Sequence, residues 1–172
     1  QRPAGGPSAD AQAQAPQGQA PQGGQRRGGF GGGFMMGGAF GDVLIKDIIP
    51  MVEKNYRVIA DTEHRAMAGL SMGGMTTRSV TLANPKVFAY VGMFSGGTIS
   101  LQDIEGAEGY KETNKALFMS AGSHEGGMGV MDAAENLRKI GINATGYISE
   151  GTAHEWHTWR RSLYQFVQLC FK

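Results

Sequence analysis

Several features that mark particular classes of protein are missing from this sequence. It contains one cysteine, Cys170, so no disulfide can form within the chain. No apolar run approaches the roughly 20 residues that span a bilayer, so we do not expect a membrane segment. The first residues do not combine a charged head with an apolar stretch, as a signal peptide does. The net charge is +1 and no basic patch alternates with aromatic residues, so nucleic acid is not an expected partner.

Composition divides the chain into two parts near residue 41. Residues 1–41 hold 13 of the 28 glycines and seven glutamines, and they lack a run of aliphatic side chains. Such a segment buries too little apolar surface to offset the entropy of ordering, so we expect residues 1–41 to be disordered. Residues 42–172 carry apolar periodicity, and roughly 130 residues are enough to build a core.

Short apolar runs alternate with helical patterns in this second part. A helix is expected to begin with Asp42 as its N-cap, and Pro50 should kink or restart it. The stretch 100–114 is polar and predicts a loop or a short helix. The expected strands are 65–70, 88–95, 116–121 and 144–149, and the later helices are 75–83, 131–140 and 156–171. This alternation predicts an α/β fold, a parallel sheet with helices on both faces.

The strongest motif is Gly69-Leu70-Ser71-Met72-Gly73, a G-x-S-x-G sequence between an expected strand and an expected helix. A serine on such a sharp turn projects its hydroxyl above the sheet, and glycine at the flanking positions avoids a Cβ clash. The Met72 N–H, at the start of the helix, would then point into an oxyanion hole. The motif predicts that Ser71 is the nucleophile of a serine hydrolase.

A serine nucleophile needs a base, and three histidines follow Ser71, as the chain order of hydrolases requires. His154 is the preferred candidate because it lies in the loop between the last expected strand and the last helix. His157, on the helix itself, and His124 remain alternatives. His64 precedes the nucleophile in a charged stretch and is expected at the surface.

The third residue of a catalytic triad orients the imidazole and should follow the third strand. Glu125 has this position, although a solvated loop carboxylate is the alternative interpretation. Asp132 lies in the same connection but is expected to begin the next helix. Asp103 follows the second strand, which is too early.

Four stretches of the chain, IIPMVEKNYRV, HRAMAGLSMGG, VFAYVGMFSGG and GTAHEWHTWRRSLYQF, resemble the esterase D group of α/β-hydrolases. That group includes feruloyl and acetyl-xylan esterases of carbohydrate esterase family 1, S-formylglutathione hydrolases and mycolyltransferases. The resemblance implies Ser71 as nucleophile, His154 as base, Glu125 as acid and Trp159 packed beneath the histidine loop. It implies no metal and no organic cofactor, and it favours a secreted or periplasmic location. Aspartate is the commoner acid in the group, so Glu125 departs from the pattern.

The resemblance also implies several strands before the serine turn and a second oxyanion donor from an HGG-like loop. Few residues with apolar periodicity precede Ser71, and no HGG-like segment lies upstream. We therefore expect residues 42–172 to form the C-terminal part of the hydrolase domain, with the N-terminal strands missing. A separate chain supplying that half is one expected partner.

The predicted function is hydrolysis of a carboxylic ester through an acyl-enzyme. The expected substrate is a small-molecule or polysaccharide ester, and a carbohydrate-linked feruloyl or acetyl ester is the first choice. A thioester of the S-formylglutathione hydrolase kind, or a small acyl ester, is the alternative within this class. A non-catalytic carbohydrate-binding or interaction module that retains the turn is the alternative from another class.

Overall fold

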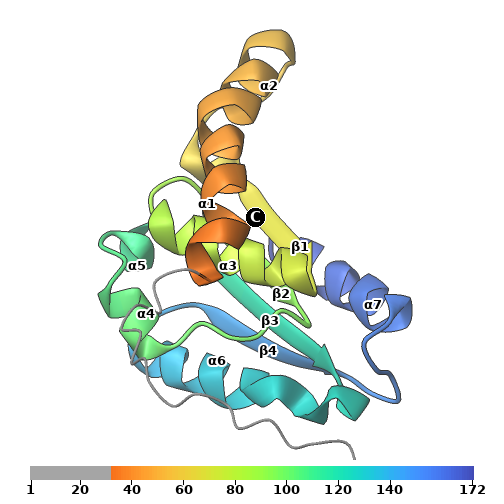
Figure 1. The fold of residues 1–172 in the computed structure, drawn as a ribbon. Coiled ribbons are helices and arrows are strands. Elements are labelled where there is room, and N and C mark those ends of the chain that lie inside the picture. Colours follow the sequence, from red (N-terminus) through yellow and green to blue (C-terminus); the bar gives the residue numbers. More distant parts are fainter. Residues whose placement is uncertain (1–31) are drawn as a thin grey trace, which may run out of the picture.

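The computed structural model describes residues 32–172, which contain one four-stranded parallel sheet (Figure 1). The strand order follows the chain: β1 (Ala66–Leu70), β2 (Tyr90–Phe94), β3 (Ala116–Gly122) and β4 (Ala144–Ser149). Each strand pairs in parallel with its neighbours. All four predicted strands are present, and their bounds differ from the predicted ones by at most a few residues.

Helices lie on both faces of this sheet, which confirms the predicted α/β class. Helices α3 (Met72–Ala83) and α6 (Val130–Lys139) pack on one face, and α7 (Trp156–Val167) packs on the other. The polar stretch after β2 forms two short helices, α4 (Leu101–Glu105) and α5 (Tyr110–Thr113). Two 3₁₀ segments are also present: η2 (Thr62–His64) precedes β1, and η3 (Ser123–Gly129) follows β3.

Side chains along the central strands alternate between two apolar cores, as the period of a strand requires. On β2, Val91 and Met93 are fully buried in the core beneath α3 and α6. Phe94 faces the other way and contacts Phe118 and Phe166 in the core beneath α7. Every residue of β2 and β3 is buried, so these two strands form the centre of the described sheet.

The N-terminal boundary predicted at Asp42 is wrong. Helix α1 spans Gly32–Val43 and packs against α3 (Figure 1). Gly41 is buried there, and a Cβ at this position would lie 3.2 Å from Val80. Glycine thus permits close helix approach, and tertiary packing outweighs the low helix propensity of a glycine-rich segment. The rest of the segment predicted to be disordered, residues 1–31, lies outside the described residues.

Asp42 is consequently not an N-cap. It lies within α1, where it forms an ion pair of 2.9 Å with Lys46. The predicted interruption at Pro50 is confirmed: η1, a π-helical turn (Leu44–Ile48), gives way to α2 (Ile49–Asn55) just before the proline. Ile49 donates to the carbonyl of Leu44, one residue further back than in an α-helix. Since Pro50 has no N–H, the helix changes register where a donor is lost.

Strand β1 is the exposed edge of the described sheet. Its one strand neighbour among the described residues is β2, and its five residues are exposed or half-buried. The chain reverses sharply at the end of this strand into α3, and the first residue after β1 is Ser71. The C-terminal edge of the sheet therefore carries the serine turn.

Candidate active site

Ser71 occupies a strained backbone conformation between β1 and α3. Its φ is 53° and its ψ is −124°, a backbone conformation that residues other than glycine rarely adopt. Hydrogen bonds hold the turn on both sides: the Ser71 N–H donates to the Phe94 carbonyl at 2.7 Å, and the Ser71 carbonyl accepts from Gly74 at 3.0 Å. This is the strand-to-helix turn that the motif predicts, and it presents the hydroxyl at the sheet edge.

The two motif glycines are not equivalent. A Cβ on Gly69 would overlap the backbone of Gly73 and approach the Gly74 nitrogen to 2.9 Å. Apart from its chain neighbours and the nearby backbone of its own helix, a Cβ on Gly73 would meet no atom of the described chain within 4 Å. Gly74, the next residue, is crowded instead, because its Cβ would lie 2.8 Å from Gly96 Cα. The expectation that both flanking glycines prevent a clash is therefore correct for Gly69 and wrong for Gly73.

Three side chains from three loops meet above this edge. His154, in the loop between β4 and α7, places Nε2 at 2.8 Å from Ser71 Oγ. Its other nitrogen, Nδ1, lies 2.6 Å from Oε1 of Glu125, which follows β3 in η3. An ionised carboxylate can only accept, so Nδ1 carries the proton and Nε2 is free to accept the Ser71 hydroxyl proton. The arrangement can pass the Ser71 hydroxyl proton to His154, and the ionised carboxylate of Glu125 can then stabilise the imidazolium.

The Glu125 carboxylate is buried and fully partnered. Its side chain is 8% exposed, and Oε2 accepts from the Gly122 N–H at 2.6 Å and from the Ser95 hydroxyl at 2.7 Å. Burial raises the pKa of Glu125, but the hydrogen bonds from Gly122, His154 and Ser95 outweigh it and hold the pKa below its usual value. The group is therefore ionised when it faces the imidazole.

Ser95 is a site residue that the sequence reasoning missed. The apolar pattern places it only at the end of the second strand, yet it is 4% exposed and its φ is 50°. Its position directly after a central parallel strand is the signal that could have found it, because the carboxyl ends of such strands converge on a site. Trp159, predicted beneath the histidine loop, donates from Nε1 to Ser95 Oγ at 3.1 Å and meets the His154 ring edge-on at 5.1 Å.

The alternative histidines are not part of this cluster. His157 lies on α7 and lines a groove rather than contacting Ser71. His64 is exposed and its Nδ1 lies 2.7 Å from Asp61, while His124 is exposed and engages Thr152 through its backbone.

The alternative carboxylates have other partners. Asp103 caps α4 together with Ser100 and pairs with Arg78 at 2.5 Å. Its carboxyl is desolvated by burial, which raises the pKa, but the hydrogen bonds from Ser100 and Arg78 hold the pKa below the usual value. Asp132 lies in the first turn of α6, where a negative charge favours the helix. Both residues are thus accounted for outside the Ser71 cluster.

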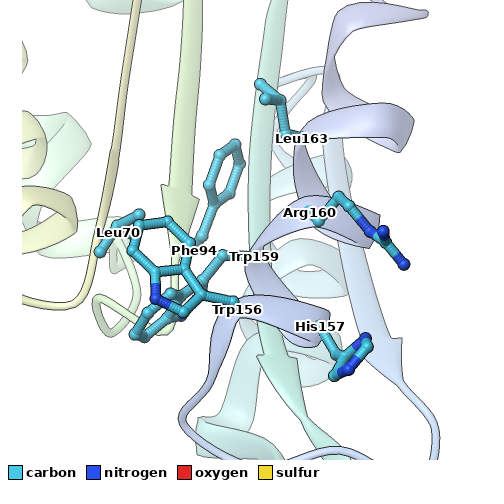
Figure 2. Close-up of a pocket in the computed structure, with 7 residues that line it drawn as sticks. All are labelled: Leu70, Phe94, Trp156, His157, Trp159, Arg160 and Leu163. Atoms are coloured by element: carbon cyan, nitrogen blue, oxygen red, sulfur yellow. The ribbon is translucent and has the colours of Figure 1, made fainter.

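An apolar groove of about 380 Å³ adjoins the cluster (Figure 2). It lies between the ends of strands β1 and β2 and helix α7, and both the strands and the helix contribute lining residues. Trp156 is 73% exposed there and meets Trp159 edge-on at 5.2 Å. The lining residues are Leu70, Phe94, Trp156, His157, Trp159, Arg160 and Leu163.

Within residues 32–172, no three His, Cys, Asp or Glu side chains gather in a way that could hold a metal ion. No helix of that range has the length and apolar character to cross a bilayer.

Comparison with known families assigns the chain. The family model described as "Putative esterase" matches residues 5–169, which is nearly the whole sequence. This chain belongs to that esterase family. The match includes the Ser71 turn, Glu125 and His154, so the contacts described above lie in a chain whose family is named for ester hydrolysis.

Two relatives illustrate how far the esterase resemblance extends. An endo-1,4-beta-xylanase/feruloyl esterase of Xylanibacter ruminicola is 44% identical over 133 residues, which cover 77% of this chain and 18% of that protein. A CE1 ferulic acid esterase from Anaeromyces mucronatus, solved in complex with ferulic acid, has a similar fold with a TM-score of 0.64 and 21% identity. The superposition covers 77% of this chain and 54% of the fungal esterase.

A second solved structure has a similar fold. S-formylglutathione hydrolase from Staphylococcus aureus has a TM-score of 0.56 and 15% identity, with 79% of this chain and 62% of that enzyme covered. The chain thus spans about a fifth of its xylanase relative and a little over half of the solved esterases.

Proposed function

We propose that this chain carries the catalytic residues of a serine hydrolase that cleaves carboxylic esters. The observation that supports this most directly is the continuous contact from Ser71 Oγ through both nitrogens of His154 to the buried carboxylate of Glu125. A hydroxyl, an imidazole and a carboxylate in this sequence form the geometry that activates a serine. Membership of the esterase family supports the same reaction class.

In the proposed reaction, Ser71 Oγ attacks the acyl carbon and its proton passes to His154 Nε2. The tetrahedral intermediate collapses, the alkoxide leaves with the proton from His154, and the acyl group stays on Ser71. Water, deprotonated by His154, then attacks the acyl-enzyme. The bond between Ser71 Oγ and the acyl carbon breaks, the proton on His154 returns to Ser71 Oγ, and the acid is released. Glu125 remains ionised throughout and stabilises the imidazolium that forms twice in the cycle.

The proposed oxyanion donor is the backbone N–H of Met72. Met72 is the first residue of α3, so no carbonyl one turn back accepts its N–H, and the helix dipole adds partial positive charge there. The proposed substrate enters with its carbonyl oxygen on this N–H. No metal or organic cofactor takes part in the proposed mechanism.

We propose a carbohydrate-linked ester, feruloyl or acetyl, as the substrate. Two relatives support this choice, because one is described as an endo-1,4-beta-xylanase/feruloyl esterase and the other was solved with ferulic acid. A thioester or another small acyl ester is the second candidate, supported by the S-formylglutathione hydrolase fold match. Comparison of kcat/KM for methyl ferulate, an acetylated xylo-oligosaccharide and S-formylglutathione decides between them.

A fluorophosphonate probe tests the proposal, because it phosphonylates only an activated serine. The wild-type 172-residue chain should be labelled at Ser71, and S71A and H154A should remain unlabelled. Ser79→Ala is the matched control, since Ser79 lies two turns along the same helix and bonds only the Met75 carbonyl. Equal labelling of the wild type and S71A would point to the alternative function, a carbohydrate-binding or interaction module.

The exposed edge of the sheet leads us to propose a polypeptide partner as well. Strand β1 has one strand neighbour in the described chain, and the groove beside it exposes Leu70, Trp156 and Leu163. Unpaired strand edges and apolar grooves of this size favour association. We propose that further strands of the esterase fold, from a longer polypeptide or a separate chain, cover both and supply a second oxyanion donor. Restoring the upstream part of the gene should raise ester turnover on the order of 10²–10³-fold, the usual effect of one such donor.

A further inference from the structure

The two carboxylate oxygens of Glu125 have different partners, and only one of them contacts His154. Oε1 contacts His154 Nδ1, and Oε2 accepts from the Gly122 N–H and from the Ser95 hydroxyl. The hydrogen bond from the Gly122 N–H is a local one, because Gly122 is only three residues from Glu125 in the chain. Ser95 is different, since it follows β2 and lies 30 residues earlier in the chain than Glu125.

The direction of the Ser95 hydrogen bond is determined by its other partner. Trp159 Nε1–H lies 3.1 Å from Ser95 Oγ, and an indole nitrogen can only donate. The hydroxyl oxygen therefore accepts from Trp159, and its single proton is directed to Glu125 at 2.7 Å. A hydroxyl that would otherwise rotate freely is thus locked as a donor to the carboxylate.

These contacts close a ring of four side chains from four parts of the fold. Trp159 on α7 touches the edge of the His154 ring, His154 contacts Glu125, Glu125 accepts from Ser95, and Ser95 accepts from Trp159. Each neighbour restricts the next, so the imidazole is held both through its nitrogen and through its ring. Hydrogen bonds of this kind, made behind the reacting residues, orient a catalytic group without touching substrate.

The backbone at Ser95 is held in a strained conformation. Its φ is 50°, it is 4% exposed, and its N–H is bound to the Ser120 carbonyl at 2.8 Å. Glycine is the residue that adopts such an angle without penalty, and glycines occupy the next two positions. A serine kept in a left-handed conformation, with its hydroxyl on a buried carboxylate, is the pattern of strain retained for function.

We propose that Ser95 is a positioning residue, which with Trp159 fixes the Glu125 carboxylate and through it the His154 imidazole. This inference rests on the proposed roles of Glu125 and His154 and names the device that aligns them. Ser95, Trp159 and Gly122 carry no charge, so His154 is the ionisable group that Glu125 contacts.

The test measures Glu125 itself, in the 172-residue chain without substrate. The side-chain carboxyl ¹³C shift of Glu125 is followed against pH in the wild type, S95A and S95G. Loss of one charge-assisted hydrogen bond should raise the pKa of Glu125 by about one pH unit, a tenfold change in its dissociation constant. S95G removes the same hydroxyl and relieves the strained φ, so it serves if alanine impairs folding.

Two further variants separate positioning from a general effect on structure. S162A removes another buried serine hydroxyl, on the same helix as Trp159 but bonded to Thr158 and Ser120, and should leave the Glu125 pKa unchanged. W159F keeps a ring beside His154 and removes the donor to Ser95. In the double variant with S95A, W159F should cause no further change in the Glu125 pKa, because both substitutions act through the Ser95 hydroxyl. An unchanged Glu125 pKa in folded S95A and S95G, or an equal shift in S162A, would overturn the proposal.

A kinetic arm links this measurement to the reaction. The rate of fluorophosphonate labelling should fall about tenfold in S95A and remain at the wild-type value in S162A. A shifted Glu125 pKa in a chain that is never labelled would refute the proposed function and leave the positioning role intact. If S95A is labelled at the wild-type rate and its Glu125 pKa is unshifted, the positioning role alone is refuted.

Discussion

Substituting Gly69 by alanine tests the physical basis of the serine turn. The added Cβ would overlap the Gly73 carbonyl group and lie 2.9 Å from the Gly74 nitrogen, closer than the 3.0 Å that real Cβ atoms respect. These are backbone atoms of α3, so no side chain can rotate away to make room. Overpacking of a rigid site costs about 1–3 kcal/mol, and we expect the upper end, about 3 kcal/mol. In a domain of this size that lowers Tm by on the order of 10 °C.

Gly73→Ala is the matched control, since it is the same chemical change four residues away. A Cβ there would meet nothing within 4 Å in the described chain beyond its neighbours and the nearby backbone of its own helix. Alanine is favoured over glycine in a helix by roughly 0.5–1 kcal/mol. Thermal unfolding followed by circular dichroism should therefore show G69A strongly destabilised and G73A equal to the wild type or slightly more stable. Equal losses in the two variants would refute the assignment of the crowding to Gly69.

Three further outcomes are expected. Because the folded-state pKa of Glu125 lies below its ordinary value of 4.5, its ionisation stabilises the fold above that pH, and this contribution is lost as the pH falls through the folded pKa. Urea midpoints should therefore separate wild type from E125Q at pH 7 more than at pH 3. L137A, at a fully buried position, should cost about 2–5 kcal/mol, and L163A, at a position 48% exposed, clearly less in the same urea titration. H157A should be labelled by a fluorophosphonate at the wild-type rate while H154A is not labelled, and the reverse result would move the proposed base to His157.

Local patterns in the sequence were enough to place the strands, the later helices and the serine turn. The apolar runs that become β2 and β3 are buried along their whole length, and a continuous apolar run is the signature of a central parallel strand. Ser71 and His154 could be proposed because their places depend on neighbours in sequence: one follows a strand within a glycine motif, and the other precedes a helix. The start of α1 could not be placed this way, because α1 packs against α3, closely enough at Gly41 for a Cβ to lie 3.2 Å from Val80, and this is a tertiary contact.

Contacts between distant segments were decided by the tertiary structure alone. Parallel pairing aligns Leu70 with Phe94 and Phe94 with Ser120, so the residues that follow these strands gather at one edge. Only this register brings Ser95 to a carboxylate 30 residues away. The close approach of Gly74 to Gly96, which follows β2, is another such contact, since a Cβ on Gly74 would lie 2.8 Å from Gly96 Cα. Sequence period reports which face a residue takes, whereas the distance between two loops depends on how the sheet pairs and twists, which no local pattern encodes.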